Sequence, residues 1–257
     1  MLRTRTPMML IASLALLGAC SSDESSNDTT VETTTATTVP DTTAPDTTVT
    51  PTTATPTTVT PTTATPTTVP AEMQPAIWPA ADVVFTTPEA AATDFLANVF
   101  GDGPVIGDFM AGDSRSGEFE VFATAEGTQI GEPRSVLFVR QLGPDDGWFV
   151  LAAGSDVATI TVPESMATVP AGMLTVDGMG TGFEATIVVS AFVAGEPDSE
   201  LDREVAMAGN FGEVLPYSVT LDLSAATTGD VVVLLIRGGT GLETDPGDFG
   251  AIPVVIG

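Results

Sequence analysis

The sequence predicts a mainly β protein, in which a disordered Thr/Pro-rich stalk precedes a small α+β domain and then a β-sandwich. Three observations predict this order. Residues 21–70 are nearly all Ser, Thr, Pro, Asp and Val. In residues 71–157, one apolar pattern of helical spacing comes before runs that alternate with a period of two. In residues 158–257, short apolar runs recur between turn-forming residues without a helical pattern.

Residues 1–19 have the layout of a bacterial export signal. Arg3 and Arg5 precede an apolar run from Met8 to Leu17, and small residues follow it. The run is too short for a bilayer-spanning helix of about 20 residues. We therefore expect a signal peptide that directs export and is then removed.

The end of this segment resembles the lipobox of bacterial lipoproteins. It consists of Leu17, Gly18 and Ala19 followed by Cys20, the single cysteine of the chain. The resemblance implies cleavage before Cys20 and a diacylglyceryl thioether on its sulfur, so that the protein is held at a membrane outside the cytoplasm. Two or three acyl chains anchor firmly, since each buried methylene contributes about 0.8 kcal/mol. The alternatives are an ordinary secreted protein cut nearby and a buried structural cysteine.

Residues 20–70 are predicted to form a disordered linker. The block PTTATPTTVT at residues 51–60 recurs as PTTATPTTVP at residues 61–70. Recurring prolines favour extended polyproline-II geometry, and the segment has too few large apolar side chains to form a core. The linker would hold the folded part away from the membrane. Both an O-glycosylated and an unmodified linker fit this composition.

Residues 71–157 are predicted to pack one helix on a small antiparallel sheet. Thr86, Thr87, Pro88 and Glu89 provide a cap candidate, a proline at the first helical position and an acid in the first turn. Apolar residues from Ala92 to Val99 continue at helical spacing. The predicted strands are 118–122, 135–142 and 148–151, the last two joined as a hairpin through the turn formers of 143–147.

Residues 158–257 are predicted to form a β-sandwich of about seven strands. The predicted strands are 158–162, 173–176, 183–193, 204–207, 215–223, 230–237 and 251–256. Alternation predicts that the inward side chains are Phe183, Ile187, Val189, Tyr217, Val219, Val231, Val233 and Leu235. In 231–236 both faces are apolar, so alternation alone does not fix the inward set there.

The same segment is similar to a known family in its strand ends and turns. The residues that carry the similarity are 160–163, 169–172, 174–178, 183–186, 211–219 and 252–254. They resemble the immunoglobulin-like domain found in bacterial spore germination proteins and in many envelope lipoproteins. The resemblance implies an immunoglobulin-like β-sandwich and, by analogy, a role in sporulation or germination. It supplies no catalytic residues.

Charge and composition exclude several classes of function. The chain has 34 acidic residues, seven basic ones that are all arginine, and no histidine, so its net charge is −27. Such a surface repels phosphate backbones, and we therefore expect no nucleic-acid partner. The lack of histidine removes the usual general base and metal ligand, and a single cysteine excludes disulfides within the chain and Cys-rich zinc sites.

No catalytic or cofactor-binding residues are predicted. Ser114 lies in a polar stretch bounded by Gly112 and Gly117, but no histidine is present to activate it. Trp148 opens an apolar strand, which favours a place in the core over a role in stacking on a ligand. The glycine-rich stretches 178–182 and 238–241 lie between predicted strands, so we interpret them as turns rather than phosphate-binding loops.

Two groups of acidic residues make a calcium site possible. Glu243, Asp245 and Asp248 could bind calcium, as could Glu196 and Asp198, although neither group follows a known ligand spacing. The prediction that fits all these observations is a non-catalytic envelope module that binds a protein or a glycan, or that has a structural role. The alternatives are a sporulation or germination protein and a hydrolase that uses two carboxylates about 5 to 10 Å apart.

Overall fold

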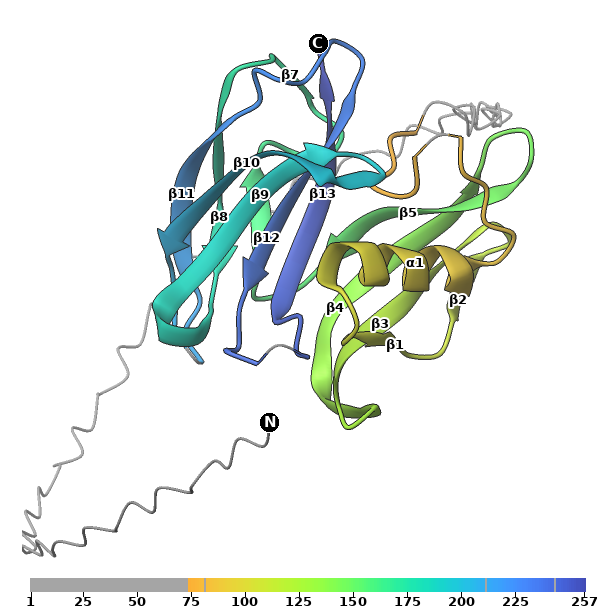
Figure 1. The fold of residues 1–257 in the computed structure, drawn as a ribbon, viewed down its shortest axis with the longest axis horizontal. Coiled ribbons are helices and arrows are strands. Elements are labelled where there is room, and N and C mark those ends of the chain that lie inside the picture. The colour runs from red at the N-terminus through yellow and green to blue at the C-terminus, as the bar shows by residue number, and fades with distance from the viewer. Residues whose placement is uncertain (1–73, 81, 211, 243) are drawn as a thin grey trace, which may run out of the picture. The chain divides into compact units, whose positions relative to one another are not determined.

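The computed structural model describes residues 74–80, 82–210, 212–242 and 244–257 (Figure 1). The predicted signal peptide, the lipobox with Cys20 and the linker lie outside these residues. Within them the chain is mainly β, with one α-helix and largely antiparallel sheets, which confirms the predicted class at this level. No helix in this part of the chain has the length and apolar character needed to cross a bilayer.

Helix α1 (Pro88–Phe100) forms where the sequence predicts it. The Thr87 hydroxyl accepts a hydrogen bond from the Ala90 amide at 3.2 Å, which caps the amino-terminal end. Gly101 ends the helix with a φ of 78°, a conformation that glycine adopts without steric strain. The buried face of the helix consists of Ala91, Ala92, Phe95 and Leu96.

Every strand predicted from the sequence has a counterpart in the structure. The strands are β1 (Val105–Ile106), β2 (Met110–Asp113), β3 (Ser116–Ala125), β4 (Thr128–Leu142), β5 (Gly147–Gly154), β6 (Thr159–Val162), β7 (Thr168–Val169), β8 (Met173–Gly180), β9 (Thr186–Val193), β10 (Glu196–Met207), β11 (Leu215–Asp222), β12 (Val231–Gly238) and β13 (Asp248–Ile256). The predicted hairpin is the pair β4 and β5. Strands β1, β2 and β7 were not expected, because they are too short to show a period.

The strands form a large sheet and a small one. The large sheet has the order β1-β3-β4-β5-β13-β12-β9-β10, with β2 beside β3 and β7 parallel to β13, and the small sheet has the order β11-β8-β6. Ala153 of β5 and Ala251 of β13 form the register pair that connects the two halves of the large sheet. Strands from both sides of residue 157 therefore lie in one sheet, while the domain boundary at 157 stays a prediction.

Two clusters of buried apolar side chains hold these layers together. The helix-side core lies between α1 and the large sheet, and it contains residues from both sides of residue 157, including Phe95, Phe119, Val233 and Phe249. The sheet-side core lies between the small sheet and β9, β12 and β13. These three strands therefore have both faces buried, and β12 is apolar from Val231 to Ile236 for that reason.

The predicted inward set is right for four of its eight residues and needs three corrections. Ile187, Val189, Tyr217 and Val219 are buried in the sheet-side core. Val233 and Leu235 are buried on the opposite face, in the helix-side core, while Val232, Leu234 and Ile236 face the small sheet. Val231 is only half-buried.

Phe183 is the third correction, since it is 44% exposed. It lies in a short 3-10 turn, η2 (Phe183–Ala185), before β9 starts. Glu184 and Ala185 have φ values of 55° and 57° there, so the period-two alternation begins only after them.

In the helix-side core, aromatic rings from residues before position 157 pack against an aromatic ring from after it. The rings of Phe100 in α1 and Phe249 in β13 lie 4.4 Å apart between centroids. Trp148 is buried in the same core, with its ring 5.9 Å from that of Phe109, which confirms the interpretation of Trp148 as a core residue.

Candidate functional site

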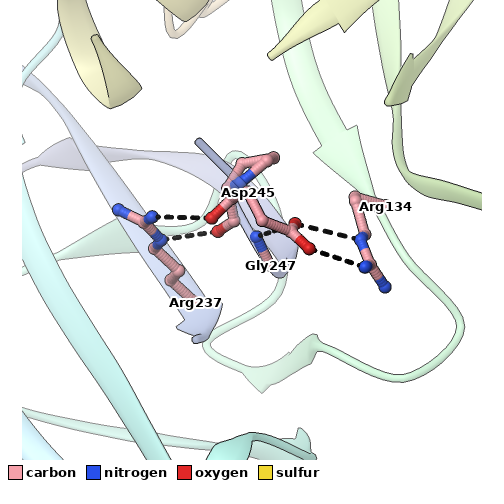
Figure 2. Close-up of polar contacts among 5 residues, drawn as sticks. Arg134, Arg237, Asp245 and Gly247 are labelled. Atoms are coloured by element: carbon pink, nitrogen blue, oxygen red, sulfur yellow. Dashed lines mark hydrogen bonds and ion pairs between the residues drawn. The ribbon is translucent and has the colours of Figure 1, made fainter. Parts of the chain in front are cut away.

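An ion pair between the partly exposed Arg134 and the buried Asp245 joins β4 to the loop between β12 and β13 (Figure 2). The Arg134 guanidinium donates from Nε to Oδ1 of Asp245 at 3.1 Å and from Nη2 to Oδ2 at 2.7 Å. Asp245 is 3% exposed, and its Oδ1 also accepts the Gly247 amide at 2.9 Å. Paired hydrogen bonds of this kind fix the plane of the guanidinium. The third nitrogen of Arg134, Nη1, is directed away from Asp245 (Figure 2).

Arg237 holds the same loop from the other side. Its Nε donates to the Pro246 carbonyl at 2.5 Å, and its Nη2 donates to the Asp245 carbonyl at 3.3 Å (Figure 2). The guanidinium carbon lies 5.3 Å from the centre of the Phe100 ring, a cation–π geometry. Burial lowers the pKa of Arg237, and the Asp245 carboxylate opposes that shift. Asp245 is therefore fixed between two arginines.

A groove of about 660 Å³ runs beside this ion pair, and we call it the seam groove. Its charged and aromatic lining residues are Glu118, Glu120, Arg134, Phe138, Asp156 and Asp248. In β3 and β4 these side chains alternate with residues of the helix-side core, so the groove lies on the sheet face that is turned away from α1. A second hollow of about 370 Å³ shares Arg134, Val157 and Asp248 with the groove.

Phe138 provides an apolar surface within the seam groove. Its side chain is 38% exposed, although large aromatic side chains are usually buried. The ring lies over Gly154 of β5, where an added Cβ would come within 3.0 Å of the ring. Glu118 is the register partner of Phe138 on β3, and Glu120 is that of Val136. Carboxylates therefore flank an exposed aromatic ring.

Asp248 is half-buried where the groove and the second hollow meet. Burial raises its pKa above the ordinary value of 3.8, the charge of Arg134 opposes this shift, and the charge of Asp245 adds to it. The folded state thus favours the protonated carboxyl of Asp248. This preference contributes fully to the stability of the folded protein below pH 3.8, and the contribution is lost as the pH rises through the raised pKa.

We therefore expect Asp248→Asn to stabilise the protein at pH 7. The gain should stay below about 1 kcal/mol, because solvent screens a half-exposed charge. It should shrink as the pH falls towards 4, where the wild-type carboxyl also becomes neutral. Urea unfolding of both proteins at pH 4 and pH 7 measures this difference, and a variant that is less stable at pH 7 would contradict the direction of the shift.

The candidate calcium ligands do not form a described site. Asp245 has both carboxylate oxygens bonded to Arg134 and the Gly247 amide, and Glu243 lies outside the described residues. Glu196 and Asp198, the other candidate ligands, are exposed in strand β10. The part of the chain that the structure describes contains no group of three or more metal-binding side chains.

The glycine-rich stretches have packing roles. Gly178 and Gly180 lie inside β8 rather than in a turn, and an added Cβ at Gly178 would lie 1.9 Å from the Thr159 carbonyl oxygen. At Gly238 it would lie 1.9 Å from the Thr181 carbonyl oxygen. The stretch with Ser114 is the tight turn between β2 and β3, in which the Arg115 amide donates to Asp113 at 2.7 Å.

The sequence indicates few residues of the seam groove. It points to Asp248 only as a candidate calcium ligand, and it gives no reason to select Arg134, Glu118 or Glu120. One local signal was present, since Phe138 interrupts the expected alternation of β4 with a large apolar side chain on the exposed face. The pairing of Arg134 with Asp245, 111 residues away, has no local signal.

In comparisons with protein-family models, curated proteins and solved structures, none matches this chain.

Proposed function

We propose that this chain is a membrane-anchored lipoprotein outside the cytoplasm, whose folded part is a non-catalytic binding or structural module of the cell envelope. The lipobox with Cys20 supports the anchor, and the Thr/Pro-rich linker supports display away from the membrane. The observation that carries the binding role is the seam groove. It combines concavity, an exposed aromatic ring and convergent polar groups on sheet strands, as ligand sites do. The net charge of −27 argues against a nucleic-acid partner.

We further propose that residues 158–257 form an immunoglobulin-like sandwich behind a small α+β domain. The small sheet faces β9, β12 and β13 across the sheet-side core, which supports the two-layer arrangement. The Tyr217 hydroxyl donates to the Thr159 carbonyl at 3.1 Å, an arrangement similar to the tyrosine corner of such sandwiches. Burial is the main cause that raises the Tyr217 pKa, so this hydroxyl stays protonated as a donor. A sporulation or germination role remains a proposal by family analogy alone.

The anchor is tested by mass spectrometry of the mature protein. We expect an amino-terminal Cys20 that carries a diacylglyceryl group, as the resemblance to a lipobox implies. Cys20→Ser should carry no acyl group, because the thioether needs the cysteine sulfur. A mature chain that starts elsewhere, or a mature Cys20 that carries no lipid, would overturn the anchor.

A carboxylate hydrolase is the second candidate, and one observation favours it. The seam groove contains four carboxylates, and the pKa of one of them, Asp248, is raised as a general acid requires. Aryl glycosides test this candidate, because release of the aryl group is measured directly. We expect a binding module to release no aryl group from these substrates. Release by the wild type that Asp248→Asn abolishes, while Asp198→Asn keeps it, would replace the binding role with a catalytic one.

A further inference from the structure

We propose that the seam groove binds a glycan without acidic groups, and this inference rests on the binding function proposed above. The groove and its adjoining hollow have volumes of about 660 and 370 Å³. Both lie in the range of about 300 to 1,000 Å³ that small-molecule sites occupy. The two spaces meet at Arg134 and Asp248, so a short oligosaccharide could contact both.

The polar groups where the groove meets the adjoining hollow favour a ligand that both donates and accepts hydrogen bonds. Arg134 is held in place by Asp245, while its Nη1 is turned away from that pair and has only donors to offer (Figure 2). The Asp248 carboxylate, when ionised, only accepts. A sugar hydroxyl does both, so neighbouring hydroxyls of one ring can satisfy the arginine and the carboxylate together.

Phe138 supplies the apolar contact that a sugar ring needs. One face of a pyranose presents C–H groups, which pack on the negative face of an aromatic ring. The exposed Phe138 ring has carboxylates of Glu118 and Glu120 beside it, which can accept from hydroxyls at the rim of the sugar.

Charge decides between glycan classes. Four carboxylates line the groove, and its one arginine is already paired with Asp245, so a uronate or a sulfated sugar would be repelled. A lysine or arginine side chain of a peptide has only donors, so it would leave Nη1 of Arg134 without an acceptor. The hydroxyls of a neutral or amino sugar supply both donors and acceptors.

A glycan array tests the inference with the mature, lipid-anchored chain in a detergent that contains no sugar. The array carries gluco-, manno-, arabino- and chito-oligosaccharides, uronate and sulfated oligosaccharides, and an arginine-rich peptide. We expect binding to at least one uncharged or amino oligosaccharide, and isothermal titration with that probe gives its Kd. Binding only to the anionic sugars, binding only to the peptide, or no binding at all would overturn the inference.

Variants then place the bound sugar. Phe138→Ala and Asp248→Asn should each raise the Kd at least about tenfold, as expected for a lost ring contact and a lost charged acceptor. Phe138→Trp should keep the affinity within about threefold, because it preserves an aromatic face. Val205→Ala and Asp198→Asn, on exposed positions of β10, are the matched controls and should leave the Kd unchanged. Unchanged binding by Phe138→Ala would overturn the assigned site.

The two proposals fail separately. An acylated Cys20 together with no glycan binding overturns the glycan inference and leaves the anchored module. Glycan binding that depends on Phe138, together with a Cys20 that carries no lipid, supports the groove and overturns the anchor.

Discussion

Phe249→Ala is expected to lower the free energy of unfolding by about 3 to 5 kcal/mol, the usual cost of truncating a fully buried phenylalanine. Phe249 is 0% exposed in β13, and its ring contacts that of Phe100 in α1. The substitution therefore opens a cavity between α1 and β13. Equilibrium denaturation in urea measures the loss.

Phe183→Ala is the matched control for this loss. Phe183 is also a phenylalanine of the second half of the chain, but it is 44% exposed in the η2 turn. Its truncation should cost less than about 1 kcal/mol, as surface substitutions do. Equal costs for the two variants would contradict the placement of Phe249 in the helix-side core.

Asp245→Ala is expected to cost about 1.5 to 3 kcal/mol, because it removes the charged hydrogen bonds to Arg134, whose side chain is 27% exposed. The variant also leaves the Gly247 amide without its acceptor. Thermal and urea unfolding should both report the loss. A further Arg134→Met substitution in the same chain should recover part of it, since the cation that has lost its partner is then gone.

The exposed pair of Arg115 and Asp146 is the control for the pair of Arg134 and Asp245. Its atoms lie 2.6 Å apart, but its side chains are 40% and 61% exposed. Asp146→Ala should therefore cost less than about 1 kcal/mol. If Asp245→Ala were as mild as Asp146→Ala, the loop between β12 and β13 would not depend on the ion pair.

Features that depend on neighbouring residues were predictable from the sequence. The ends of α1 follow from Thr87, Pro88 and Gly101, whose conformational preferences act within one turn. Strands with one buried face, such as β11, show a clean alternation, and Tyr217 and Val219 are buried as that alternation requires.

Features that depend on distant pairing could not be predicted in this way. β12 is apolar on both faces because a different core covers each of them, and a period of two cannot assign Val232 and Val233 to those cores. The seam groove exists because β5 pairs with β13, which lies almost one hundred residues further along the chain. Neither strand has a sequence pattern of its own that predicts this pairing.

The seam groove requires that the residues on both sides of position 157 fold together, so their shared unfolding is the most direct test. Hydrogen exchange of the mature chain, measured by mass spectrometry at increasing urea concentration, reports each strand separately. We expect the amides of β4 and β12 to lose protection at the same urea concentration, because both strands line the helix-side core. Protection that persists in β12 after β4 has exchanged completely would show two independent folding units and would contradict a site built between them.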